Sequence, residues 1–129
     1  MNFIFNDGGR SKAGFKGSTK DCPVRAMCIA LGLNYKEVYN QLANANKAYS
    51  GVKTVRKGMN VGVFSDILDS YGWVWNSAPT FTGRKARCSD LTGTVIARQS
   101  KHVVAVVDGV PQDTFDSSFK MVYGYWAKK

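Results

Sequence analysis

Apolar residues in the first half of the chain recur at helical spacing. Pro23 suits the first position of a helix, where its missing N–H costs nothing. Gly32 is typical of the position just after a helix, so we predict a helix over residues 23–31. Its predicted buried face consists of Val24, Met27, Cys28 and Leu31.

Two more helices are predicted before residue 73. Asn34 suits the N-cap of the second, with Glu37 at the third helical position, as in a capping box. The third runs from about residue 60 to residue 71, and Gly72 follows its end. Residues 50–59 between them are predicted to form a basic loop. The predicted buried positions are Val38, Leu42, Ala45, Val63, Phe64, Ile67, Leu68 and Tyr71.

The second half of the chain changes to β-branched and aromatic runs bounded by turn residues. Asp108-Gly109 predicts a two-residue hairpin turn, with a return strand from about Val110. The other predicted strands cover residues 73–75, 94–98, 102–107 and 121–126.

Residues 1–20 are rich in Gly, Ser, Lys and Asn and predict an irregular lead-in, with at most a short strand at residues 3–5. Helices followed by strands indicate an α+β fold. We therefore expect a single domain over residues 1–129, with N-terminal helices packed on a C-terminal antiparallel β-sheet.

Composition narrows the functional classes. The chain lacks the apolar runs of a membrane span and the start of a signal peptide, so we expect a cytoplasmic protein without a membrane partner. Three cysteines, one histidine and no CxxC argue against disulfides and structural zinc, and no cofactor is predicted. The net charge of +9 favours acidic partners, although a charged surface also serves solubility.

The candidate chemistry rests on a cysteine at a helix start and the single histidine at a strand start. A helix N-terminus favours the thiolate form, so Cys22 is the candidate nucleophile. His102 is the candidate base, because thiol catalysis needs a group that accepts the proton. Cys28 lies inside the apolar stripe of its helix and is predicted to be a core residue.

The hairpin turn predicts the third member of the site. If Val107 pairs with Val110, His102 lies opposite Phe115, and Asp113 is its diagonal neighbour on the same face. Asp113 is thus the predicted orienting carboxylate. Asp116 is the alternative, which a one-residue bulge would select.

These two blocks of sequence resemble the papain-like cysteine peptidase superfamily. The blocks are Asp21-Cys22-Pro-Val-Arg-Ala-Met-Cys-Ile-Ala, and Lys101-His102-Val-Val-Ala-Val-Val-Asp-Gly with Asp113-Thr-Phe-Asp116. Within this superfamily, the blocks most resemble the leader-peptidase domains of bacteriocin exporters, and they also resemble small papain-like proteins that recur in bacteriophage genomes. The resemblance implies a Cys-His-Asp site that attacks an amide through a thioester, in a phage- or bacterium-encoded hydrolase. A phage protein of this kind would act in the host cytoplasm.

One position departs from the family. Where the family usually has the glutamine that completes the oxyanion hole, this chain has Lys16. Lys16, Ser18 and Thr19 are the candidate substitutes, beside the backbone N–H of Cys22.

Three functions follow from the sequence. The first is a cysteine peptidase or related amide hydrolase acting on a peptide or protein. The second is an inactive papain-like scaffold that binds an acidic host protein, which the lysine at the glutamine position supports. The third and least favoured is a basic nucleic-acid-binding module, whose aromatic residues between lysines and arginines would stack on bases.

Overall fold

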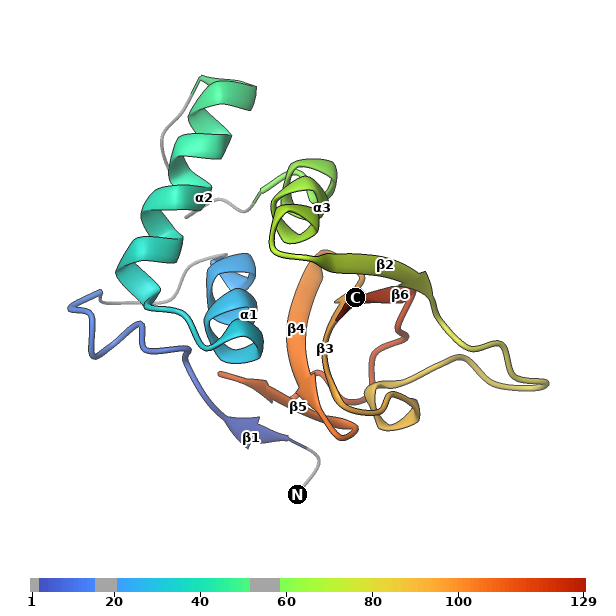
Figure 1. Ribbon diagram of the computed structural model, residues 1–129. Helices are drawn as coiled ribbons and strands as arrows, with labels where there is room; N and C mark the ends of the chain where they lie inside the picture. Colours follow the sequence, from blue (N-terminus) through green and yellow to red (C-terminus); the bar gives the residue numbers. More distant parts are fainter. Residues whose placement is uncertain (1–2, 16–20, 52–58) are drawn as a thin grey trace.

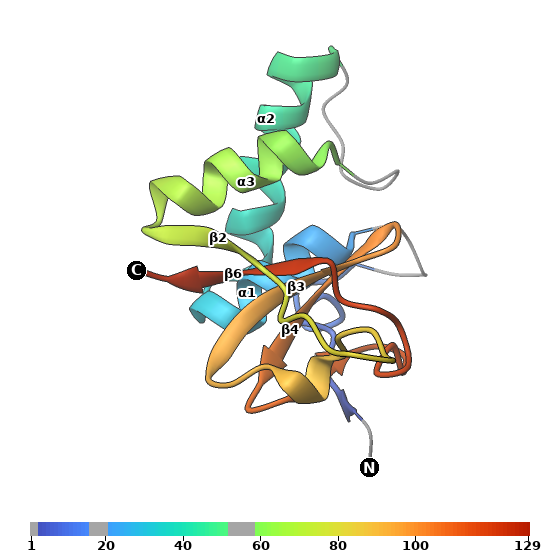
Figure 2. The same cartoon turned by 90° about the vertical axis from the view of Figure 1, so that its right-hand side faces the viewer.

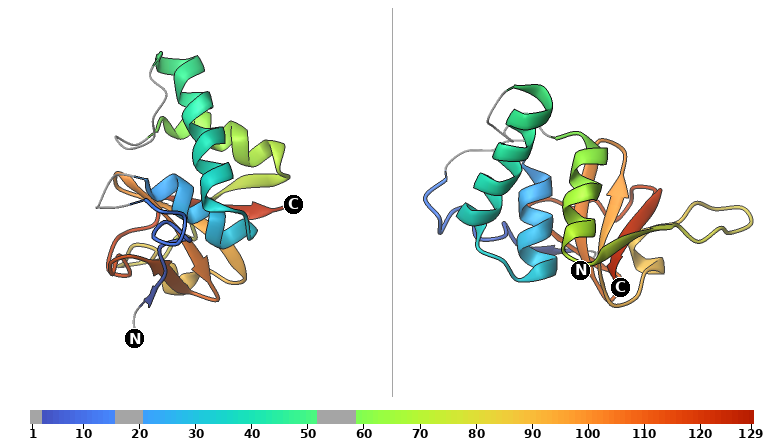
Figure 3. Two further views of the ribbon diagram at one scale, coloured as in Figure 1. Left: turned by 90° about the vertical axis from the view of Figure 1, so that its left-hand side faces the viewer. Right: turned by 45° about the horizontal axis from the view of Figure 1, so that its top comes forward.

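The computed structural model describes residues 3–15, 21–51 and 59–129. Three helices, α1 (Cys22–Leu31), α2 (Tyr35–Ser50) and α3 (Val61–Ser70), lie on one side of a six-stranded sheet (Figures 1 and 3). Helix α1 packs against the middle of the sheet, α2 packs on α1, and α3 lies beside the second strand. The predicted α+β class is confirmed. None of these described helices is long and apolar enough to cross a membrane.

The helices begin and end where local chemistry predicts. The Asn34 side chain accepts a hydrogen bond from the backbone N–H of Glu37 at 3.2 Å, which caps α2. Asn60 caps α3 in the same way, through the N–H groups of residues 62 and 63. Gly32 ends α1 in the left-handed conformation. Tyr71 was predicted to be buried but is 38% exposed, because its hydroxyl donates outward to Gln41 on α2.

The sheet is mixed rather than wholly antiparallel. Its strand order is β1-β5-β4-β3-β6-β2. The pair formed by β1 and β5 is parallel, and the other four pairs are antiparallel. A parallel pair needs a long connection, and the whole helical half lies between β1 and β5. The strands are β1 (Ile4–Phe5), β2 (Trp73–Ser77), β3 (Thr94–Gln99), β4 (His102–Val107), β5 (Val110–Asp113) and β6 (Gly124–Lys128).

The last strand starts later than the sequence pattern predicts. Residues 121–123 cross the end of the sheet, where the N–H of Val122 donates to the carbonyl of Ala86. The strand begins at Gly124, which packs on the ring of Trp75. A Cβ there would come within 2.3 Å of that ring, so the glycine permits the close approach of β6 and β2.

Apolar side chains form a core on each face of the sheet. Between the helices and the sheet lie Met27, Leu42 and Phe64 of the three helices, packed with residues such as Trp126. The opposite face carries a second cluster with Val95 and Val106, which the chain between β2 and β3 covers (Figure 2). That segment includes the short 3₁₀ turn η1 (Cys88–Asp90). With apolar residues on both faces, the sheet is a rigid support for residues at the ends of its strands.

Candidate active site

Cys22 is the first residue of α1, as the sequence predicts. It is half-buried, whereas Cys28 on the same helix and Cys88 in η1 are buried. Pro23 occupies the first turn, and the preceding Asp21 turns its side chain inward instead of capping the helix. The thiol therefore lies at the positive end of the helix dipole, which favours a thiolate.

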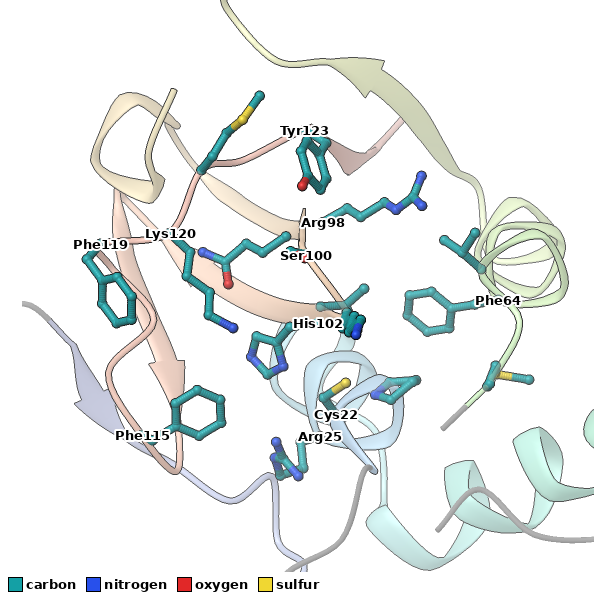
Figure 4. A pocket seen from close by; sticks show the side chains of 17 residues that line it. Cys22, Arg25, Phe64, Arg98, Ser100, His102, Phe115, Phe119, Lys120 and Tyr123 are labelled. Carbon is teal, nitrogen blue, oxygen red and sulfur yellow. The ribbon is translucent and has the colours of Figure 1, made fainter. Parts of the chain in front are cut away.

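His102 begins β4 directly after a tight turn. The β3–β4 hairpin pairs Gln99 with His102, and Lys101 between them has a positive φ of 53°. The imidazole is 8% exposed, and its ring lies beside Cys22 (Figure 4). Both side chains line the same cleft. The two predicted partners are thus brought together from positions far apart in sequence.

Asp113 ends β5 and lies beside the same histidine. The β4–β5 pair has the predicted register, with Val107 opposite Val110. The Nε2 of His102 lies 2.6 Å from Oδ2 of Asp113. This contact leaves Nδ1 as the ring nitrogen available to the thiol of Cys22. The predicted hydrogen bond between His102 and Asp113 is therefore present.

The protonation of this pair follows from its surroundings. Burial lowers the pKa of His102, but hydrogen bonds with Asp113 and Cys22 and the charges of both partners raise it to about 9. Burial raises the pKa of Asp113, but the hydrogen bond and charge of His102 outweigh this effect and bring it below the ordinary value. The raised pKa of His102 beside the lowered pKa of Asp113 thus favours an imidazolium paired with a carboxylate.

A buried set of charges, which the sequence reasoning missed, holds Asp113 from the other side. Arg25 donates to Oδ1 of Asp113 at 3.2 Å and also to Asp21, which is 0% exposed. Asp21 in turn accepts from Arg10 at 2.9 Å and from the hydroxyl of Tyr35. The set fixes the start of α1 to the end of β5. Asp21 and Arg25 have the i,i+4 spacing of an ion pair on a helix. This spacing is the one feature of the sequence that could have indicated the buried charges.

The N-terminal lead-in therefore contributes to the site. Residues 3–15 follow an irregular path apart from β1, as predicted, but they pack on α1. The clearest contact is at Gly8, where a Cβ would lie 3.0 Å from Cα of Arg25. This close approach places Arg10 within reach of Asp21. The backbone N–H of Asn6 also donates to the carbonyl of Asp113 at 2.8 Å.

The other candidate residues are not part of this arrangement. Asp116 accepts from the backbone N–H of Ser118 at 2.9 Å and so stabilises a local turn, away from His102. Lys16, Ser18 and Thr19, the candidate oxyanion residues, lie outside the described residues, as does most of the basic loop at residues 50–59. No group of three metal-ligating side chains occurs in the described parts of the chain.

A cleft of about 830 Å³ opens beside Cys22 and His102 (Figure 4). Its walls come from the start of α1, from α3, from the β3–β4 hairpin and from the chain between β5 and β6. This volume suits a ligand the size of a few amino-acid residues. Cys28 and Cys88 do not line it. The structure thus combines a thiol, a base and an orienting carboxylate at one accessible cleft.

Comparisons of the chain with protein-family models, with curated proteins and with solved structures give no match. The resemblance to papain-like peptidases consequently stays a prediction that rests on the residues themselves.

Proposed function

We propose that this protein is a papain-like thiol hydrolase that cleaves an amide bond in a peptide or protein. The observation that supports this most strongly is the position of His102, which is hydrogen-bonded to Asp113 and lies beside Cys22. Cys22 also stands at a helix N-terminus and lines the cleft. Thiol hydrolases need this combination of nucleophile, base and orienting group.

The reaction would proceed through a thioester. The Cys22 thiolate attacks the carbonyl carbon, and the backbone N–H of Cys22 is a candidate donor to the oxyanion. The imidazolium of His102 gives its proton to the leaving amine as the C–N bond breaks. The neutral imidazole then takes a proton from water, which attacks the thioester and releases the acid and the thiolate. Asp113 keeps the ring oriented and stabilises the imidazolium without taking the proton.

Selective alkylation tests the reactive pair without a known substrate. We expect iodoacetamide at pH 7 to modify Cys22 at least about 100-fold faster than Cys28 or Cys88, because a thiolate is the reactive form. Mass spectrometry of tryptic peptides taken over time gives the three rates. His102→Ala should slow modification of Cys22 tenfold or more, since it removes the imidazolium that stabilises the thiolate. Equal rates for Cys22 and the two buried thiols would contradict the proposal.

Hydrolysis itself is tested with a mixture of peptides derived from a bacterial cell digest. The native protein should create new peptide termini, and Cys22→Ala should create none. A reactive Cys22 that forms no new termini would refute the peptidase and leave the scaffold hypothesis. Neither experiment addresses the location of the protein, so the cytoplasmic site of action stays a prediction.

A further inference from the structure

The cleft beside Cys22 has an unbalanced charge. Four of its lining residues are basic, namely Arg25, Arg98, Lys101 and Lys120, and none is acidic. Arg25 is neutralised by Asp21 and Asp113. The other three form no salt bridge with any carboxylate in the described parts of the chain. A cleft that gathers three unpaired cations attracts an anion.

The free cations come from separate elements around the reactive pair. Arg98 belongs to β3, Lys101 to the β3–β4 turn, and Lys120 to the chain between β5 and β6. Figure 4 shows the Lys120 side chain reaching toward His102, while that of Arg98 lies beside Tyr123 and points away from His102. A ligand bound in the cleft would therefore meet positive charge from more than one wall.

Exposed aromatic rings line the same cleft. Phe115, Phe119 and Tyr123 line the cleft and are 44%, 66% and 45% exposed. The ring of Phe115 packs against His102 at a centroid distance of 5.0 Å. Large apolar side chains left in water around a cleft are typical of a binding site. The partner therefore offers apolar groups as well as negative charge.

We propose that the cleft selects an acidic peptide, in which Asp or Glu side chains flank an apolar residue next to the bond attacked by Cys22. This proposal rests on the proposed hydrolase function and names its substrate class. Carboxylates would pair with Arg98, Lys101 and Lys120, and the apolar residue would lie among the aromatic rings. A nucleic acid also has negative charge and flat rings, but the Cys-His pair acts on a carbonyl carbon. That chemistry favours the peptide.

The test measures binding without turnover, using Cys22→Ala protein and fluorescein-labelled octapeptides. Three matched peptides carry Glu, Gln or Lys at the two positions that flank a central Phe-Ala pair. We expect the Glu peptide to bind about tenfold more tightly than the Gln peptide, and the Lys peptide to bind least, as two partly screened ion pairs would give. Raising the salt concentration should shrink this difference.

Substitutions in the cleft identify the cations that cause the preference for the Glu peptide. Lys120→Gln and Arg98→Gln, each in the Cys22→Ala protein, should reduce the Glu-over-Gln preference about threefold. Lys36→Gln is the matched control, because Lys36 is exposed on α2 and does not line the cleft. It should leave the preference unchanged.

Three results would overturn the inference. They are equal binding of the Glu and Gln peptides, an equal loss of preference in the Lys36→Gln control, and tighter binding of a single-stranded DNA 12-mer that the cleft variants abolish. The alkylation of Cys22 in the native protein is measured separately. Failure of the hydrolase proposal would therefore show as an unreactive Cys22 or as an absence of new peptide termini, and failure of this inference as a missing preference for Glu.

Discussion

Helix α1 holds two cysteines, in opposite environments. Cys22 at the first residue is half-buried, lines the cleft and lies beside His102. Cys28 is 5% exposed and packs in the apolar core. Burial, with a smaller effect of the Asp21 charge, raises the pKa of its thiol to about 12. A cysteine thus serves as the candidate nucleophile at the start of the helix, and as a small apolar core residue about two turns further along it.

The difference lies in what surrounds each thiol rather than in the helix itself. Near Cys22 the buried carboxylates of Asp21 and Asp113 are both bonded to Arg25, so the charge there is compensated. At Cys28, burial and the negative charge of Asp21 both oppose formation of a thiolate. A buried anion without such compensation is strongly disfavoured. A reactive cysteine here requires an opening to solvent and a set of paired charges together.

Asp113→Asn is expected to have the largest effect on this contrast. An amide cannot stabilise the imidazolium, so alkylation of Cys22 should slow about 100-fold or more, toward the rate of Cys28. The change also breaks a buried pair with Arg25, which should lower the free energy of unfolding by roughly 3–5 kcal/mol. Alkylation rates and urea unfolding curves measure the two effects.

Asp116→Asn is the control for this substitution. Asp116 supports only a local turn, so both measurements should stay close to those of the native protein. A loss of reactivity with Asp116→Asn and not with Asp113→Asn would show that the register seen between β4 and β5 does not hold in solution.

The second prediction concerns how the stability of the protein depends on pH through the groups around Cys22 and through Cys28. The pKa of His102 is raised in the folded protein, so its stabilising contribution is present below about 6.5 and is lost as pH rises to about 9. The lowered pKa of Asp113 makes its contribution disappear as pH falls through acid values. Cys28, with a raised pKa, costs stability only above about 9, where the unfolded thiol ionises.

We therefore expect the free energy of unfolding to be greatest between about pH 4 and 6.5, and to fall by at most ~3 kcal/mol up to pH 9. Urea unfolding at several pH values gives this profile. His102→Gln should flatten it between pH 6.5 and 9 and leave the decline above pH 9 in place. A native profile that is flat from pH 6 to 9 would show that His102 is not held as an imidazolium.

Cys28→Ala should have the smallest effect. It removes a buried sulfur remote from the cleft, so the alkylation rate of Cys22 should stay within twofold of the native value. The small space left in the core should cost about 1 kcal/mol of unfolding free energy. Kinetic alkylation and urea unfolding of this variant measure both quantities. Slower alkylation of Cys22 would mean that the packing around Cys28 affects the reactivity of Cys22.

Local signals made much of the fold and the candidate site predictable. Asn34 and Gly32 fix helix ends by hydrogen bonds within a few residues. The Asp108-Gly109 turn sets the register that brings Asp113 to His102, and it acts over one short hairpin. The meeting of Cys22 with His102 rested on the chemical need of a thiol for a base, and not on any local pattern.

The contacts between residues far apart in the chain could not be predicted from the sequence pattern. The contact between Arg25 and Asp113 has no local signal, because Asp113 lies on another element far along the chain. Arg10 belongs to a segment rich in turn residues, whose fit against α1 depends on tertiary packing. The parallel pairing of β1 was missed for the same reason, since a two-residue strand has no periodicity to recognise.

That two-residue strand also bears on self-association. β1 forms one edge of the sheet and covers β5, the four-residue strand that carries Asp113. A very short edge offers an approaching chain few free backbone groups, which discourages edge-to-edge pairing. Without β1, the open backbone of β5 would be the new edge, and a second molecule could pair with it. Strand β1 thus helps to keep neighbouring molecules apart.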